Sequence, residues 1–254
     1  MATNQKKNKA TLVDDKQYWK TRHAQQANLK ASGLKSVSLK ANHYIYKILE
    51  DQYLKLLNSL DLSGVKSVLD CGFGNGYFIK FYRKHFPHLE IFGVDISKDA
   101  KDKIDFLPKN RLYTDDLATF SPKRKFDIVH SFDVMYHILD TDDYVKALSN
   151  IATLSNKYVI LHERFLGRAP LVSSRHVRLR RAEFTDQILN SKGFFLQSEV
   201  PTHFIAVRLL TYKLNKLIPG LLYKIDRYIS ERAHPSTQET LASHYIRVYS
   251  RSRE

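Results

Sequence analysis

Short apolar runs alternate with amphipathic stretches through the middle of the chain. The runs predict strands at about 66–71, 90–95, 110–114, 126–132 and 157–164, and the stretches between them have the apolar spacing of helices. This alternation is typical of a parallel sheet wound by right-handed crossovers. Two later runs, Phe194–Val200 and His244–Tyr249, predict a sixth and a seventh strand.

Helical patterns flank this alternating core on both sides. Asn42–Leu60 has the spacing of an amphipathic helix that packs on a sheet, and Asp14 and Asp15 are suited to start an earlier helix. A third helical pattern separates the sixth and seventh strands. The expected organisation is a flexible basic tail at 1–12, a helical cap at 13–60, and a main domain at 61–254 with a helical insertion at about 204–240.

The first strand ends in an acid that is followed by alternating glycines. Asp70 precedes Gly72, Gly74 and Gly76, and a helical segment begins at Tyr77. Glycine allows a positive φ and the close approach of a ligand, and the start of a helix offers unpaired N–H groups. The turn is therefore expected to bind a nucleotide-like molecule.

The spacing distinguishes two classes of nucleotide. A dinucleotide-binding turn has its third glycine three residues after the second, where this chain has Tyr77. Asp70 would repel a pyrophosphate but would attract an ammonium group. Asp95 ends the next strand and is suited to accept hydrogen bonds from ribose hydroxyls. The expected ligand is a nucleoside with a cationic amino-acid end, which disfavours a nicotinamide-dependent protein.

These residues resemble motif I of the class I S-adenosylmethionine-dependent methyltransferases. The resemblance implies a Rossmann-like α/β fold, in which a seven-stranded and mostly parallel sheet has an antiparallel last strand and helices on both faces. It also implies S-adenosylmethionine as the cofactor. Asp70 and Gly72 would hold its methionine part, Gly74 and Gly76 would pass beneath it, and Asp95 would hold its ribose.

The resemblance extends to later segments. Tyr113–Leu117 is similar to the family segment whose acid faces the adenine, which is assigned here to Asp116, and Phe126–His137 is similar to the fourth strand and the loop that lines the active site. In several related groups an N-terminal helical segment covers the cofactor, so aromatic residues at Tyr18, Trp19 and Tyr46 are either lid residues or ordinary packing residues. The cofactor-binding residues expected on this basis are Asp70, Gly72, Gly74, Gly76, Asp95, Ile96, Asp116, Leu117, Ser131, Tyr18 and Trp19.

Two histidines are candidates for a catalytic base. Transfer of a methyl group to a hydroxyl requires removal of a proton, and histidine suits this near neutral pH. His137 follows the fourth strand and His162 ends the fifth, so both are expected near the pocket, whereas Glu163 should point the other way. The alternative for His137 is a packing role in a short helix.

Charge widens the choice of acceptor. The formal net charge of +15 favours an acidic partner such as RNA, an anionic membrane surface or a phosphorylated acceptor. Arginines in Arg175–Arg181 suit a phosphate or carboxylate, or else form a solvated face. No Asn-Pro-Pro-Tyr-type segment follows the fourth strand, which disfavours methylation of nucleic-acid bases. The favoured hypothesis is O-methylation of a small-molecule or lipid- or glycan-linked acceptor, the alternatives being an RNA or protein methyltransferase and a non-catalytic cofactor-binding scaffold.

The sequence allows several roles for the insertion and gives indications of the cellular location. Residues 205–233 combine helical apolar spacing with basic residues, which suits packing on the domain, a pocket wall, a homodimer face or peripheral membrane contact. No apolar run approaches the ~20 residues that span a bilayer, and Met1–Lys9 lacks the apolar part of a secretory signal. The single cysteine, Cys71, is expected to be a buried filler. We expect a cytoplasmic protein, possible contact being with the inner membrane face.

Overall fold

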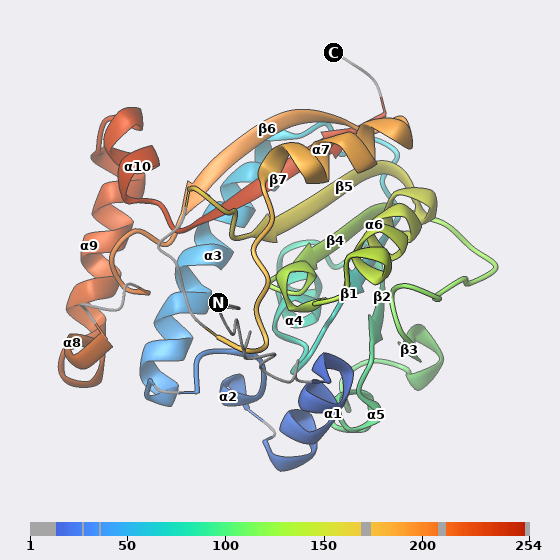
Figure 1. Cartoon of the computed structure of the whole chain (residues 1–254), viewed down its shortest axis with the longest axis horizontal. Coiled ribbons are helices and arrows are strands. Elements are labelled where there is room, and N and C mark those ends of the chain that lie inside the picture. Colours follow the sequence, from blue (N-terminus) through green and yellow to red (C-terminus); the bar gives the residue numbers. More distant parts are fainter. Residues whose placement is uncertain (1–13, 27, 36, 169–173, 208–211, 252–254) are drawn as a thin grey trace, which may run out of the picture.

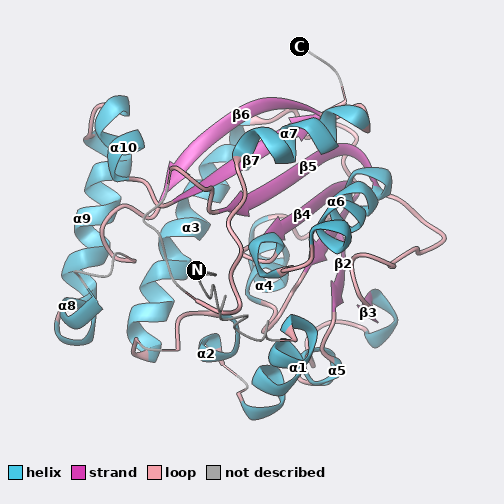
Figure 2. Cartoon of the chain, viewed as in Figure 1, coloured by secondary structure: helices cyan, strands magenta, loops and turns pink. Residues whose placement is uncertain are grey.

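The fold is one seven-stranded sheet with helices packed on both faces (Figures 1 and 2). A computed structural model of the chain describes residues 14–26, 28–35, 37–168, 174–207 and 212–251. The predicted tail at 1–12 lies outside these residues. The strands are β1 (Ser67–Cys71), β2 (Glu90–Asp95), β3 (Leu112–Thr114), β4 (Phe126–Phe132), β5 (Ser155–Glu163), β6 (Phe195–Thr202) and β7 (His244–Ser250).

The strand order is β3-β2-β1-β4-β5-β7-β6. Strands β1 to β5 are parallel, and β7 lies antiparallel between β5 and β6. The predicted Rossmann-like fold, with its antiparallel last strand, is confirmed. Because β1 lies between β2 and β4, the chain leaves β1 on one side and later returns on the other, which opens a crevice at the carboxyl ends of these strands.

Each face of the sheet buries its own apolar cluster. Val68 of β1 packs with Tyr53 of α3 (Leu39–Ser59) and Phe78 of α4 (Tyr77–His85) on one face. Its neighbour Leu69 points to the opposite face and packs with Leu148 of α6 (Thr141–Leu154), beside α7 (Ala182–Ser191). Side chains alternate between faces along a strand, so a parallel strand covered on both sides is apolar throughout.

The N-terminal helices divide between two tasks. The longest of them, α3, belongs to the core just described. The preceding α1 (Asp15–Gln25) and α2 (Leu29–Ser32) lie below the carboxyl ends of the strands in Figure 1. Asp14 accepts a hydrogen bond from the backbone N–H of Gln17 and so starts α1. The guanidinium of Arg22 is buried and donates to the carbonyl oxygen of Lys30, which holds α1 and α2 together.

The insertion consists of α8 (Tyr212–Leu217), α9 (Pro219–Arg232) and α10 (Pro235–Leu241). Ile218 separates α8 from α9, which begins with Pro219. The inner side of α9 packs on α3, where Gln52 donates to Ser230 at 2.7 Å and Tyr44 stacks on Tyr223. None of the helices in the described part of the chain is long and apolar enough to cross a bilayer.

One buried carboxylate anchors α9 to the rest of the domain. Asp226 accepts hydrogen bonds from the backbone N–H groups of Phe204, Ile205 and Ala206, at distances of 2.7–3.3 Å. These three groups lie in the segment that follows β6. The carboxylate therefore fixes the path of the chain between the sheet and the insertion.

We expect Asp226→Ala to lower the free energy of unfolding by about 2–4 kcal/mol, because it leaves backbone N–H groups without an acceptor. Urea denaturation measures this change. Arg227→Ala is the matched control, because its pair with Glu231 is exposed to solvent and should contribute little to stability. Equal losses in the two variants would contradict the anchoring role.

Candidate active site

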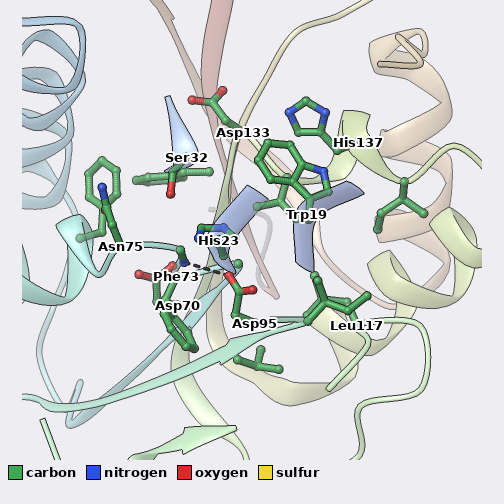
Figure 3. A pocket seen from close by; sticks show the side chains of 18 of the residues that line it. Trp19, His23, Ser32, Asp70, Phe73, Asn75, Asp95, Leu117, Asp133 and His137 are labelled. Carbon is green, nitrogen blue, oxygen red and sulfur yellow. Dashed lines mark hydrogen bonds between the residues drawn. The ribbon is translucent and has the colours of Figure 1, made fainter. Parts of the chain in front are cut away.

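A pocket lies at the carboxyl ends of β1, β2 and β4, with α1 across it (Figure 3). This is the crevice that the strand order creates. Its wall is formed by α1 and α2, by Tyr46 of α3, by the glycine turn and the start of α4, by the ends of β2 and β3, and by the loop after β4. The lining residues include Trp19, His23, Ser32, Tyr46, Asp70, Gly72, Gly74, Asn75, Asp95, Ile96, Asp116, Leu117, Asp133 and His137.

The two glycines of the turn that line the pocket have no room for a side chain. Gly72 and Gly74 have φ of 81° and 52°, a region that L residues rarely adopt. A Cβ atom on Gly72 would lie 2.3 Å from a methyl group of Val134, and one on Gly74 would lie 2.3 Å from the Ser32 hydroxyl. Both glycines line the pocket. Gly76 instead precedes α4 and is not part of the wall, since it faces Ile104.

Asp95 holds the glycine turn against β2. One of its carboxylate oxygens accepts from the backbone N–H of Gly74 at 2.9 Å, the contact drawn in Figure 3, and the other accepts from Ser97 at the same distance. Asp95 and the adjacent Ile96 both line the pocket. The carboxylate keeps further lone pairs that suit hydroxyl donors of a ligand.

Asp70 places a buried carboxylate in the pocket wall. Only 3% of the residue is exposed, and within the described residues its side chain makes no hydrogen bond. Its nearest basic group is His130 Nε2, at 3.8 Å. Burial raises the pKa of Asp70 well above its ordinary value, and the neighbouring Asp95 adds to the rise. An entering cation would supply the missing partner.

An ion pair ties α1 to the opposite rim. The Lys16 ammonium lies 2.6 Å from the Asp116 carboxylate and 2.9 Å from that of Asp143 at the start of α6. Both acids raise the pKa of Lys16, the contact with Asp116 most strongly. Asp116 and Leu117 both line the pocket, but the carboxylate of Asp116 is shared with a lysine that sequence spacing did not reveal.

The aromatic residues expected in the lid have different positions. Trp19 lines the pocket and packs edge-on against His137, with ring centroids 4.6 Å apart. Tyr46 also lines it. Tyr18 is not part of the wall and stacks on His176, with centroids 4.5 Å apart.

Asp133 presents a carboxylate at the end of β4. Its backbone has a positive φ of 58°, and its N–H donates to the carbonyl oxygen of His162. Its Oδ1 lies 3.0 Å from Nδ1 of His162, whose Nε2 lies 2.9 Å from the Thr202 hydroxyl. Burial would raise the pKa of Asp133, but His162, His244 and His203 outweigh this effect and lower it. The carboxylate is therefore ionised at neutral pH.

His137 lies in the pocket wall as a neutral imidazole. Its Nδ1 is 2.7 Å from the carbonyl oxygen of His176, so Nδ1 carries the proton and Nε2 keeps the lone pair. Burial lowers the pKa of His137 to about 3. The ring therefore stays in its proton-accepting form throughout the physiological pH range.

Two of the expected site residues lie behind the wall. His162, predicted to lie near the pocket, is fully buried and is not part of the wall; its position on β5 places its ring behind Asp133. Ser131 is also fully buried and does not line the pocket. Cys71 packs in the core, as expected of a filler.

Sequence patterns missed a residue that shapes the loop after β4. The buried carboxylate of Glu163 accepts from the backbone N–H groups of Met135 and Tyr136, both at 3.1 Å. It thereby fixes the short turn that carries His137. The expectation that Glu163 points away from His162 fits this arrangement, but nothing in the spacing linked it to a loop 27 residues earlier.

The arginine run contributes to the same loop. Arg178 donates to the carbonyl oxygen of Leu139 at 2.8 Å, and Arg180 donates to that of Ile138 at 2.9 Å. Arg180 also lies over the ring of Tyr144. Two arginines that could have held an anion therefore stabilise the chain after β4 instead.

Comparison with known proteins identifies the family. A model of the family described as "Methyltransferase domain" matches residues 41–199, more than half of the chain. The chain is a class I S-adenosylmethionine-dependent methyltransferase. None of the curated proteins matches it in sequence.

Solved structures share the fold of this methyltransferase at low sequence identity. Magnesium protoporphyrin IX methyltransferase from Synechocystis PCC 6803, with bound S-adenosylmethionine, is 17% identical; the match covers 95% of this chain and 99% of that one, with a TM-score of 0.57. A putative methyltransferase in complex with the Haloferax volcanii activator Trm112 is 11% identical. This second match covers 84% of this chain and 94% of that one, with a TM-score of 0.58.

S-adenosylmethionine is the cofactor, and the pocket of this methyltransferase suits it. The cofactor carries an ammonium and a sulfonium group, and Asp70 is a buried carboxylate that lacks a cationic partner. Asp95 offers acceptor lone pairs for hydroxyls at the tip of β2, and Gly72 and Gly74 leave the backbone bare between these two acids.

We expect Asp95→Ala to weaken the binding of S-adenosylhomocysteine by about 1–3 kcal/mol, since it removes acceptors for ribose and releases the Gly74 N–H. Isothermal titration calorimetry measures the affinity. Glu90→Ala, at the exposed opposite end of β2, is the control and should bind as the wild type does. An unchanged affinity of Asp95→Ala would mean that this acid does not hold the cofactor.

We expect Asp70→Asn to act in opposite directions on stability and binding. The raised pKa means that the unfolded chain releases this proton at lower pH than the folded protein, so the wild type loses stability as pH rises from the ordinary aspartate value towards the raised one. Asparagine removes this loss and should raise the stability of the cofactor-free protein at neutral pH. Below the ordinary value the difference should vanish.

The same variant should bind S-adenosylmethionine about 1.5–3 kcal/mol more weakly, because a charged acceptor for its ammonium group is lost. Urea denaturation at neutral and acidic pH and calorimetry measure the two effects. A variant that is less stable than the wild type at neutral pH would show that Asp70 is already satisfied within the protein.

Proposed function

We propose that the methyltransferase acts on an oxygen atom of a small-molecule or lipid- or glycan-linked acceptor. The observation that carries this proposal is the pair of proton acceptors after β4. Asp133, held ionised by His162, and His137, held neutral with its lone pair on Nε2, both line the cofactor pocket. A hydroxyl between them and the cofactor would have a group to receive its proton.

Methyl transfer requires few further functions of the protein. When bound, S-adenosylmethionine supplies an electrophilic methyl group. The remaining work is to align the acceptor within ~3–3.5 Å, to exclude water and to take up the proton. Trp19 and Tyr46 give the pocket an apolar wall on the α1 side, and Lys16 draws α1 across it. Nε2 of His137 or the carboxylate of Asp133 is the destination of the proton.

An anionic acceptor is not part of this proposal. The arginine run suggested an anionic acceptor, but Arg178 and Arg180 donate hydrogen bonds to backbone carbonyl oxygens. The carboxylate of Asp133, with 31% of its side chain exposed, would repel an anion at the acceptor end. Neutral hydroxyls are therefore better suited to the site than phosphates or carboxylates.

A methylation screen tests the class of acceptor. Cell extract is separated into small-molecule, lipid, glycan, RNA and protein fractions, and each is incubated with the enzyme and deuterated-methyl S-adenosylmethionine. We expect the mass shift in the small-molecule, lipid or glycan fraction, on oxygen. Label in RNA or protein would overturn the proposal, and binding of the cofactor without label in any fraction would favour a scaffold.

We expect His137→Gln and Asp133→Asn to slow methylation of the acceptor found in this way by about 10²–10⁴-fold in total, while S-adenosylhomocysteine binding falls far less. His88→Gln, on the exposed surface, is the control. Because burial holds the pKa of His137 near 3 instead of 6.5, the rate should show no inflection near the ordinary histidine pKa. Full activity of both variants would exclude them as proton acceptors.

A further inference from the structure

Exposed large apolar side chains are concentrated in α8 and α9 of the insertion. Leu217 is 78% exposed at the end of α8, Leu221 is 51% exposed in the first turn of α9, and Tyr228 is 66% exposed two turns later. Leu214 and Ile218 are also exposed. We call Leu214, Leu217, Ile218, Leu221 and Tyr228 the outer face. They are five of the eight exposed large apolar residues found in the described part of the chain.

This face is not the packing surface of α9. The helix is already held on its inner side, where Leu222 and Ile229 are buried and Asp226 binds three backbone N–H groups. Leu221 and Tyr228 are seven residues apart and so lie on one side of the helix, turned away from that anchor. A helix that is apolar on both sides needs a second partner for its outer face.

The charge beside the outer face is positive. Lys224 is exposed and lies three residues after Leu221 and four before Tyr228, so it shares their side of α9. Arg232 is exposed at the end of the helix, and the whole chain has a formal net charge of +15. Figure 1 shows α8 and α9 at an edge of the molecule, on the far side of α3 from the sheet.

We propose that the outer face of α8 and α9 binds the surface of an anionic membrane. Leucines and a tyrosine at a helix edge can enter the region between headgroups and acyl chains, and Lys224 can reach back to the lipid phosphates. A second copy of the chain suits the face less well, because a two-fold interface would bring Lys224 and Arg232 of both copies together within two strongly basic molecules.

The inference is independent of the methyl acceptor. Membrane binding would leave the cofactor pocket as it is, and the pocket could be filled without a membrane. A membrane-bound enzyme would meet lipid-linked acceptors in two dimensions, so a positive result would raise the priority of the lipid fraction in the methylation screen.

Vesicle flotation of the full chain tests the proposal. We expect the protein to float at low salt with phosphatidylcholine vesicles that contain about one-third phosphatidylglycerol, to float poorly with phosphatidylcholine alone, and to be released at high salt. Leu217→Asp combined with Leu221→Asp should lower the bound fraction at least about tenfold, because it puts charges into the inserted surface. Lys224→Glu should weaken binding by a smaller factor.

Matched variants separate the face from general effects. Leu196→Asp changes an exposed leucine on β6, and Lys123→Glu reverses an exposed charge away from the insertion; both should float as the wild type does. S-adenosylhomocysteine binding, measured in parallel, reports on the folding of each variant and on the cofactor site, so a failure there would concern the proposed function and not the outer face.

Three results would overturn the proposal. The first is a wild-type protein that stays with the unbound fraction at low salt. The second is flotation of the double leucine variant equal to that of the wild type. The third is a dimer in analytical ultracentrifugation that the same two substitutions convert to a monomer, which would assign the face to a second copy of the chain.

Discussion

The site depends on the bond between the Asp95 carboxylate and the Gly74 backbone. A turn of alternating glycines has little side-chain packing of its own, and glycine loses more backbone conformational entropy on folding than other residues do. Asp95 fixes this turn from the neighbouring strand by accepting from the Gly74 N–H, and glycine is needed there because the backbone has a positive φ and a Cβ atom would meet the Ser32 hydroxyl. The order of strands β2, β1 and β4 places the two elements side by side. The strand order of the sheet thus determines where the glycine turn lies at the floor of the pocket.

Two of the carboxylates that line this pocket lie in different electrostatic environments. Asp70 is buried without a hydrogen-bond donor in the described structure, so its ionised form is unfavourable until a cation arrives. Asp133 is surrounded by three histidines, one of which touches it, so its ionised form is favoured from the outset. The carboxylate of Asp70 therefore suits attraction of a cationic cofactor at one end of the pocket, and the carboxylate of Asp133 suits proton exchange with an acceptor at the other end.

The strands whose bounds follow from local sequence patterns could be predicted from the sequence. The strand β4 has the predicted bounds, and β1, β2 and β7 differ from expectation by a residue or less at each end, because apolar runs between breakers define them. The glycine turn and its two acids were equally visible, since their spacing is local. The resemblance to a known family added the cofactor, which spacing alone described only as a cationic nucleoside.

Contacts between segments that are distant in the sequence could not be predicted from it. Lys16 meets Asp116 across 100 positions, and the side chain of His162 faces Asp133 because of how β4, β5 and β7 pair. Nothing in the spacing of these residues distinguishes them from solvated charges or core histidines. Glu163 is similar, because its partners are backbone groups that have no sequence signature. Such contacts decide which histidine reaches the pocket, and they explain why His137, and not His162, lines it.

The N-terminal helix α1 and the insertion helix α9 are attached to the rest of the domain in different ways. The helix α1 crosses the pocket, and its ties to the opposite rim include the partly exposed pair of Lys16 with Asp116, whose strength falls with salt. The helix α9 is fixed by a buried carboxylate and by apolar contacts with α3, which salt affects little. The attachment of α1 to the rim of the pocket through Lys16 is therefore more sensitive to salt than the attachment of α9 to the rest of the domain.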